Sequence, residues 1–215
     1  MTARTLAVAR YVAADVVRSQ RVLIPVVAYG VVLAILLSDS VGRPPGVWPA
    51  TVLALYPAAA WLTLVVANTE APAQRLVTMA AAGGPVRLVT GTVLVALAAD
   101  AALVLLSVVV PVVRAADPYP AEALLSGVLA HVAAATTGTA IGVLCARPLV
   151  TRIGWSFLLA VSVVTITAVQ PWLPPVGSAV RALTSNGPPP LGEALLGLLL
   201  VASAATVAVA ADRRA

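Results

Sequence analysis

The chain contains no lysine, and this absence excludes two kinds of chemistry. Its 215 residues include 13 basic side chains, all of them arginine. A phosphate-binding P-loop depends on a lysine that reaches the phosphates, so the chain is not itself a Walker-type ATPase. Schiff-base catalysis needs a lysine amine and is excluded for the same reason.

Cysteine and histidine are nearly absent as well. Cys145 and His131 each occur once, so there is no internal disulfide and no closed zinc site. Ser126 shares a predicted helix with His131, and Leu124 stands where a rhomboid-type Gly-x-Ser-Gly motif would have glycine, which argues against a serine hydrolase. We therefore expect no catalytic residue, metal or resident cofactor in this chain.

Charge is scarce, whereas apolar residues are abundant. Only 10% of the residues are charged, 61% are hydrophobic, and the mean hydropathy is +1.03. This composition is typical of a membrane protein. The net charge is +5, and in a membrane protein such a surplus orients loops and binds anionic lipid rather than nucleic acid.

Six apolar stretches are candidates for helices that cross the hydrocarbon core, which takes about 20 residues. They lie near 22–38, 48–67, 87–113, 121–146, 153–170 and 191–211. Strands of a membrane β-barrel would be shorter, at about 10 residues, and would alternate in polarity. The sequence therefore predicts an all-α membrane protein, with residues 1–215 forming a single transmembrane domain of six spans.

The arginines predict the orientation of these spans. If the N-terminus is inside, the cytoplasmic segments hold ten arginines and the outer segments hold three, namely Arg43, Arg114 and Arg181. This bias follows the positive-inside rule and makes both termini cytoplasmic.

Two segments outside the spans have a distinctive composition. Residues 1–21 carry arginines along one side of a helix, which predicts an interfacial amphipathic helix; a partly ordered basic tail is the alternative. Residues 170–192 hold six prolines and are expected to form an outer loop. Its apolar middle either dips into the outer leaflet as a short helix or belongs to a stiff solvated loop.

Residues 72–82 are predicted to form a short cytoplasmic helix between the second and third spans. Pro72 suits a first helical position, and Gly83-Gly84-Pro85 is a strong stop signal. Three polar residues share one side of this helix and four apolar residues share the other: Gln74, Arg75 and Thr78 against Ala73, Leu76, Val77 and Ala80. A helix this short is marginal in water, so it needs a membrane or a protein to lie on.

The order of these features resembles the membrane-spanning permease subunits of type-2 ABC exporters, the bacterial superfamily that exports drugs, polysaccharides and peptides. Those subunits have an N-terminal interfacial helix, six spans, and a coupling helix between spans two and three. The local sequence is also similar: Glu70, then Arg75-Leu76-Val77-Thr78, then Gly84-Pro85-Val86-Arg87 and Gly91. The chain departs from the family at Thr92, where many members have lysine, and in the alanine content of the helix.

The resemblance implies a permease of the bacterial cytoplasmic (inner) membrane that pairs with a second permease chain, identical or related. Two separate ATPase subunits beneath it would hold ATP and Mg²⁺. The residues implied in coupling to them are Glu70, Gln74, Arg75, Leu76, Thr78 and Met79. Leu76 and Met79 would enter a groove of the ATPase, while Glu70 and Arg75 would meet charges at its rim. A substrate-binding subunit of an energy-coupling importer and a non-transport membrane scaffold remain alternatives, as does a helix that merely rests on lipid.

Two ionisable residues, Asp100 and His131, fall inside predicted spans at similar depth. An intramembrane acid costs at least about 2.5 kcal/mol at the centre of a helix and almost always faces a partner or a cavity. We therefore expect Asp100 to face the protein interior or a water-filled path and never lipid, and in that position it could pair with His131. A packing role is favoured over a proton relay or a polar patch on a transport path.

The fourth span also has a small residue at every fourth position, namely Ala130, Ala134, Gly138 and Gly142. Such a stripe lets two helix backbones approach closely. Packing within the chain is favoured over packing across a dimer.

Overall fold

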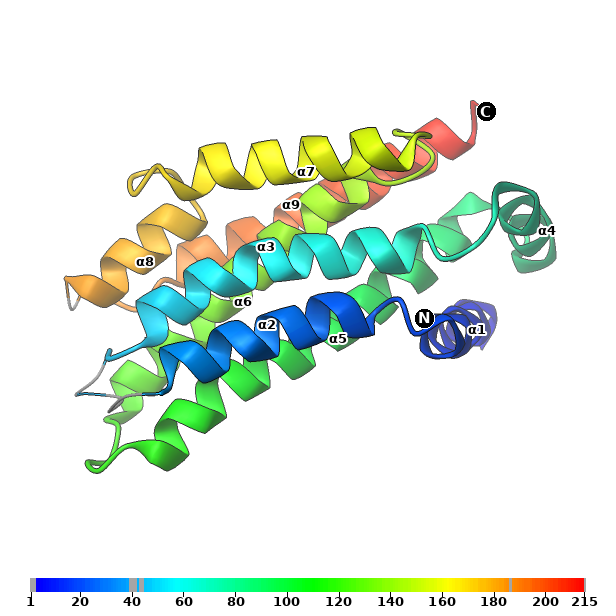
Figure 1. Ribbon diagram of the computed structural model, residues 1–215. Coiled ribbons are helices and arrows are strands. Elements are labelled where there is room, and N and C mark those ends of the chain that lie inside the picture. Colours follow the sequence, from blue (N-terminus) through cyan, green and yellow to red (C-terminus); the bar gives the residue numbers. More distant parts are fainter. Residues whose placement is uncertain (1–2, 39–41, 43–44, 186, 215) are drawn as a thin grey trace.

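The computed structural model describes residues 3–38, 42, 45–185 and 187–214, and every regular element in this part of the chain is a helix. In chain order these are α1 (Ala3–Ser19), α2 (Leu23–Leu36), α3 (Trp48–Ala67), α4 (Pro72–Ala82), α5 (Pro85–Arg114), α6 (Ala121–Cys145), α7 (Ile153–Ala168), α8 (Val176–Thr184) and α9 (Leu191–Asp212) (Figure 1). Arg43, one of the arginines assigned to the outer side, lies outside the described residues.

Four of these helices are long and apolar enough to cross a membrane: α3, α5, α6 and α9. The pair α1 and α2, bent by 73° at its break, adds a fifth candidate if it is counted as one span. α2 has 14 residues and α7 has 16, which is short of the roughly 20 that a span usually needs. The all-helical membrane class is thus confirmed with four to five candidate spans, and the count of six stays a prediction.

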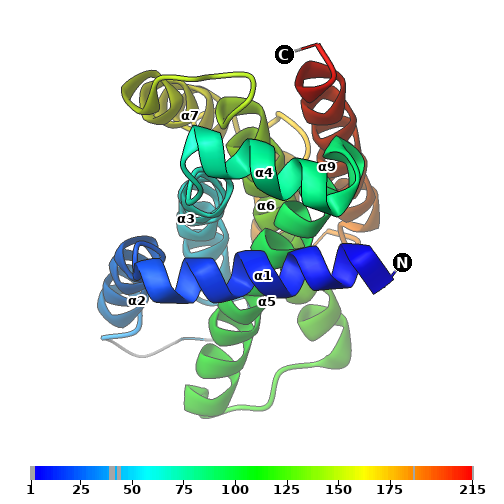
Figure 2. The same ribbon diagram turned by 90° about the vertical axis from the view of Figure 1, so that its right-hand side faces the viewer.

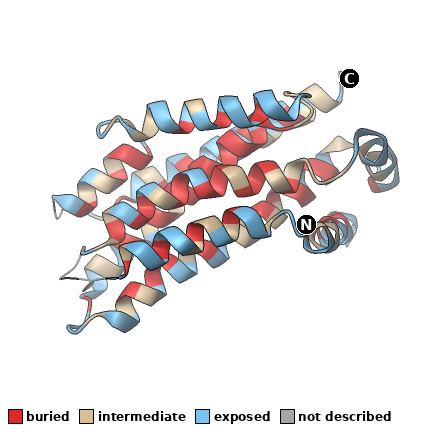
Figure 3. Cartoon of the chain, viewed as in Figure 1, coloured by how far each residue is buried: buried red, intermediate tan, exposed pale blue. Residues whose placement is uncertain are grey.

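α6 forms the centre of the bundle. It packs against α3, α5, α7, α8 and α9, and residues 133–143 are buried without exception. Figure 3 shows buried positions running along α3 and α6, while α2 and α7 present exposed positions outward. Because this part of α6 consists largely of alanine, glycine and threonine, its neighbours can approach the backbone closely from several sides.

The small-residue stripe on α6 packs within the chain. A Cβ atom added to Gly138 would lie 2.6 Å from the carbonyl oxygen of Tyr56, and one added to Gly142 would lie 2.5 Å from the Cβ of Thr63. Ala130 and Ala134 are fully buried in the same core. The close approach that the stripe predicts is therefore made to α3.

α1 and α4 cross one end of the bundle, and the C-terminus lies at that same end (Figures 1 and 2). α1 is held there by Val8, Val12 and Val16, which pack with Leu88 and Ala96 of α5. The apolar face of α1 therefore covers protein, which differs from a helix that rests on lipid alone.

α8 lies at the opposite end of the bundle. Val176, Ala179 and Leu183 are buried in the main core cluster, and the helix packs against α3, α6, α7 and α9. The apolar middle of the proline-rich segment thus folds onto the bundle as a helix, and the alternative of a stiff solvated loop is not what the structure has.

Candidate functional site

A proline sets the first residue of α4, and a glycine pair ends the helix. Pro72 is the first helical residue, and Gly83 follows the last one in the left-handed conformation, with φ +77°. The Gly84 N–H then donates to the Met79 carbonyl at 3.0 Å, and Arg87 donates to the Ala82 carbonyl at 2.9 Å. These bonds satisfy carbonyls that the helix end leaves without partners, so α4 stops sharply before α5 begins.

The polar side of α4 is turned toward the rest of the chain. Arg75 donates from Nη2 to Oδ2 of Asp212 at 2.6 Å, and the two side chains are only 12% and 6% exposed. Asp212 is the last residue of α9, so this ion pair fastens α4 to the end of a long apolar helix. Asp212 was not predicted; the signal for it was an acid at the end of an apolar run, directly before Arg213.

Two further hydrogen bonds tie down the other polar residues of α4. Gln74 donates to the hydroxyl oxygen of Tyr11 on α1 at 2.6 Å. Thr78 donates to Oε1 of Glu70, just before the helix, at 2.7 Å. The residues predicted to meet charges on a partner are therefore engaged inside the chain, and Glu70 and Arg75 are not free rim charges in this structure.

The apolar side of α4 is turned outward. Leu76 and Val77 are 62% and 71% exposed, and Ala73 and Ala80 beside them are exposed as well. We call these four residues the α4 apolar face. A water-exposed helix normally shows the reverse pattern, with its apolar side inward, so this face calls for a covering surface.

Met79 lies partly buried between α4 and its neighbours. It packs against the cluster that contains Val8 and Val12 of α1 and Leu88 of α5. Met79 is therefore part of the packing that holds α4, and its role in coupling to a partner stays a prediction. Val77, one of the apolar residues of the helix, occupies the exposed position instead.

Asp100 faces the protein interior, as expected, with an exposure of 1%. Its Oδ2 accepts a hydrogen bond from the hydroxyl of Thr139 on α6 at 2.6 Å. This bond joins α5 to α6 in the middle of the bundle.

His131 has partners of its own, and the suggested pair with Asp100 is not formed. Nδ1 donates to the Gly127 carbonyl at 2.7 Å, and Nε2 lies 2.9 Å from the hydroxyl of Thr51 on α3. His131 and Thr139 are eight residues apart on one helix, a separation of about 12 Å at 1.5 Å per residue. The similar depth estimated from the sequence was too coarse to detect this difference.

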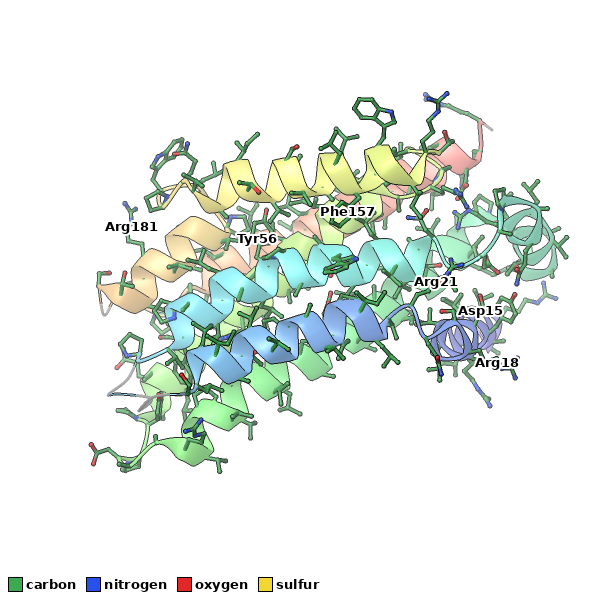
Figure 4. All side chains as sticks on the ribbon, in the orientation of Figure 1. Asp15, Arg18, Arg21, Tyr56, Phe157 and Arg181 are labelled. Carbon is green, nitrogen blue, oxygen red and sulfur yellow. The ribbon has the colours of Figure 1, made fainter. Side chains whose placement is uncertain are left out.

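Arginine is concentrated at the end of the bundle where α1 and α4 lie. The helices, helix ends and connections that Figure 1 shows at this end carry ten arginines by sequence position: Arg4, Arg10, Arg18, Arg21, Arg75, Arg87, Arg147, Arg152, Arg213 and Arg214. Figure 4 labels Arg18 and Arg21 at this end and Arg181 at the other. Among the described arginines, Arg114 and Arg181 belong to the α8 end.

The described part of the chain holds no group of three or more His, Cys, Asp or Glu side chains that could bind a metal ion. Its candidate functional feature is thus a surface, the α4 apolar face, on a helix that an ion pair and two hydrogen bonds connect to the rest of the chain. Comparisons with protein-family models, curated proteins and solved structures found no match to this chain.

Proposed function

We propose that this chain is the permease subunit of an ABC-type exporter in the bacterial cytoplasmic membrane. It works as one half of a transmembrane dimer, with two separate ATPase subunits at the end where α1 and α4 lie. ATP and Mg²⁺ belong to those partners, and this chain contributes the transmembrane path and the coupling element rather than catalysis.

The observation that carries the proposal is the α4 apolar face. Leu76 and Val77 project from a helix that crosses the end of the bundle, while the polar side of the same helix is bonded to its own chain. A short amphipathic helix presented in this way suits a hydrophobic groove on a partner protein. A few side chains that are fully buried at the centre of an interface usually supply most of its affinity.

Contacts inside the chain give a route for coupling. A push on α4 reaches α9 through the Arg75–Asp212 ion pair and reaches α1 and α5 through Met79 and its cluster. ATP-driven closure of the ATPase subunits would shift α4 and, through these contacts, tilt the helices that line the path.

The proposal includes six spans, with α2 and α7 as the two short ones. At 1.5 Å per residue, helices of 14 and 16 residues are about 21 and 24 Å long. Flanking residues and local thinning of the bilayer accommodate such lengths at modest cost. α7 runs from the α4 end of the bundle to α8 at the other end (Figure 1), which supports counting it as a crossing.

The test is the ATPase activity of the chain assembled with an ABC ATPase subunit in liposomes. Val77→Glu and Leu76→Glu should weaken assembly at least about 30-fold, because a buried unpaired charge at an anchor position costs 2 kcal/mol or more. Val17→Glu is the matched control, since Val17 is 70% exposed on α1 at the same end of the bundle. It should leave assembly intact.

Each of the other outcomes favours an alternative. Equal losses in all three variants would mean that this end rests on lipid without specific docking. Assembly with an ATPase only through a third membrane chain would favour the substrate-binding subunit of an importer. Assembly with no ATPase at all would favour a membrane scaffold.

A further inference from the structure

A groove runs between α3 and α7 from the end of the bundle where α1 and α4 lie. Its wider part, of about 120 Å³, is lined mainly by Trp61, Leu64 and Val65 of α3 and by Ile153 and Phe157 of α7. A narrower part of about 30 Å³ continues along the same helices and shares Trp61, Leu64 and Phe157 with the first. The rings of Trp61 and Phe157 meet edge to face, with centroids 5.9 Å apart, and Figure 4 labels Phe157. Because Ile153 and Phe157 are exposed, the groove opens on the surface of the bundle and a ligand can reach its walls.

Arg21, in the connection between α1 and α2, lines the wider part of this groove. Its side chain is exposed and makes no ion pair or hydrogen bond with any described residue. The other polar lining groups are engaged within the chain. The Asn68 amide nitrogen donates to the Leu64 carbonyl at 2.9 Å, and the Ser156 hydroxyl donates to the Arg152 carbonyl at 3.3 Å. Of the described lining residues none is an acid, so the Arg21 guanidinium is left to meet a ligand.

We propose that this groove binds one anionic phospholipid, with its phosphate on Arg21 and an acyl chain lying along α3 and α7. The apolar walls extend far enough for such a chain, since Pro57 and Val65 in the lining are eight positions apart on α3, about 12 Å at 1.5 Å per residue. A guanidinium binds phosphate through charge-assisted hydrogen bonds. It favours a lipid with a net negative charge over phosphatidylcholine, in which the choline cation opposes the attraction.

A lipid fits the groove better than a helix of another chain does. An apolar helix face would cover the same walls but would bury the Arg21 guanidinium without a partner, which is costly. A lipid satisfies both features, because its headgroup stays in the polar layer while its chain lies in the hydrocarbon. Basic side chains near the ends of membrane helices extend toward that layer. This binding property belongs to the chain alone and does not depend on an ATPase partner.

The experiment follows the fluorescence of Trp61 in the full chain, with Trp155→Phe and Trp172→Phe removing the two exposed tryptophans. Trp48 stays in place, and because it is fully buried it gives a constant background. The chain is placed in phosphatidylcholine bilayers with rising fractions of either brominated phosphatidylglycerol or brominated phosphatidylcholine, whose bromine atoms quench tryptophan on contact. Quenching should show about a fivefold preference for phosphatidylglycerol, the preference that one arginine near a membrane surface confers.

Two pairs of variants locate the site. Arg21→Gln should bring the preference close to one, whereas Arg18→Gln removes an exposed arginine of α1 outside the lining and should leave it unchanged. Val161→Phe narrows the inner part of the groove and should reduce quenching of Trp61 by phosphatidylglycerol. Val163→Phe, at another exposed position of α7 that does not line the groove, should not.

Three results would overturn the proposal. Equal quenching by the two brominated lipids would mean that ordinary boundary lipid covers the groove. Equal loss of preference in Arg18→Gln and Arg21→Gln would assign the effect to the general charge of this end. Quenching by neither lipid would mean that protein, such as a second copy of the chain, covers Trp61. None of these measurements involves an ATPase, so this proposal and the proposed function fail separately.

Discussion

The Arg75–Asp212 ion pair joins two residues that are 137 positions apart in sequence. Both side chains are largely shielded from water, so the pair is neither solvated as a surface pair would be nor fully withdrawn into the bundle. Its position lets one short bond fix the angle of α4 relative to the end of α9.

We predict that Arg75→Ala lowers the free energy of unfolding by about 1.5–3 kcal/mol, the range for a hydrogen bond to a charged group. Asp212→Ala should act similarly, and the exchanged pair Arg75→Asp with Asp212→Arg should recover part of the loss. The measurement is unfolding of the purified chain in mixed micelles. Arg213→Ala, at the exposed neighbouring position, is the control and should have little effect. Independent, additive losses in the exchanged pair would contradict a direct pairing.

His131 gives a second prediction at this scale. Thr51→Val removes the hydroxyl beside Nε2 and should destabilise the chain by about 1–3 kcal/mol, since it leaves a buried acceptor unpaired. Thr51→Ser keeps the hydroxyl and should be near wild type in the same unfolding assay. If transport fails in Thr51→Val while stability is unchanged, His131 acts on the transport path and the packing role is wrong.

Among the elements, α4 shows what a sequence can and cannot reveal. Its bounds were predictable because Pro72 and Gly83 act locally on the backbone, and its two-sided pattern was predictable from helical spacing. The direction in which each side faces was not, because that depends on Asp212, which is distant in sequence. The packing of Met79 was not predictable for the same reason: its packing partners on α1 and α5 are brought to it only by the fold.

α6 supports a prediction about the approach of two helices. Gly142→Ala should destabilise the chain by roughly 1–3 kcal/mol, the cost of overpacking, because the added Cβ would meet Thr63 and the Ala60 carbonyl of α3. Gly30→Ala in α2 is the matched control, since nothing lies within 4 Å of an added Cβ there. It should be neutral or slightly stabilising, as alanine is the better helix former. Thermal unfolding of both variants checks the contrast, and a similar response in both would argue against close packing at Gly142.

For the whole molecule, composition alone predicted the helical membrane class, because a chain this apolar has no polar coat for solution. The number of crossings was harder to predict. Apolar length marks α3, α5, α6 and α9 clearly, but α2 and α7 are short, and only their course through the bundle indicates whether they cross. The two ends of the molecule differ in arginine content, and the positive-inside rule expects the arginine-rich end in the cytoplasm. The number of crossings and the orientation of the chain must therefore be tested together.

Cysteine labelling tests both points together. Cys145 is buried and can be replaced by serine, with single reporters at Ala81→Cys in the last turn of α4 and Ser185→Cys after α8, both at exposed positions. In intact cells that express the chain alone, a membrane-impermeant maleimide should label position 185 and should reach position 81 only after permeabilisation. The reason is that α5, α6 and α7 separate the two positions, and three crossings put them on opposite sides. Labelling of both positions from outside would mean that α7 does not cross. Labelling of position 81 alone would invert the molecule, moving α4 away from any cytoplasmic ATPase and removing the basis for its coupling role.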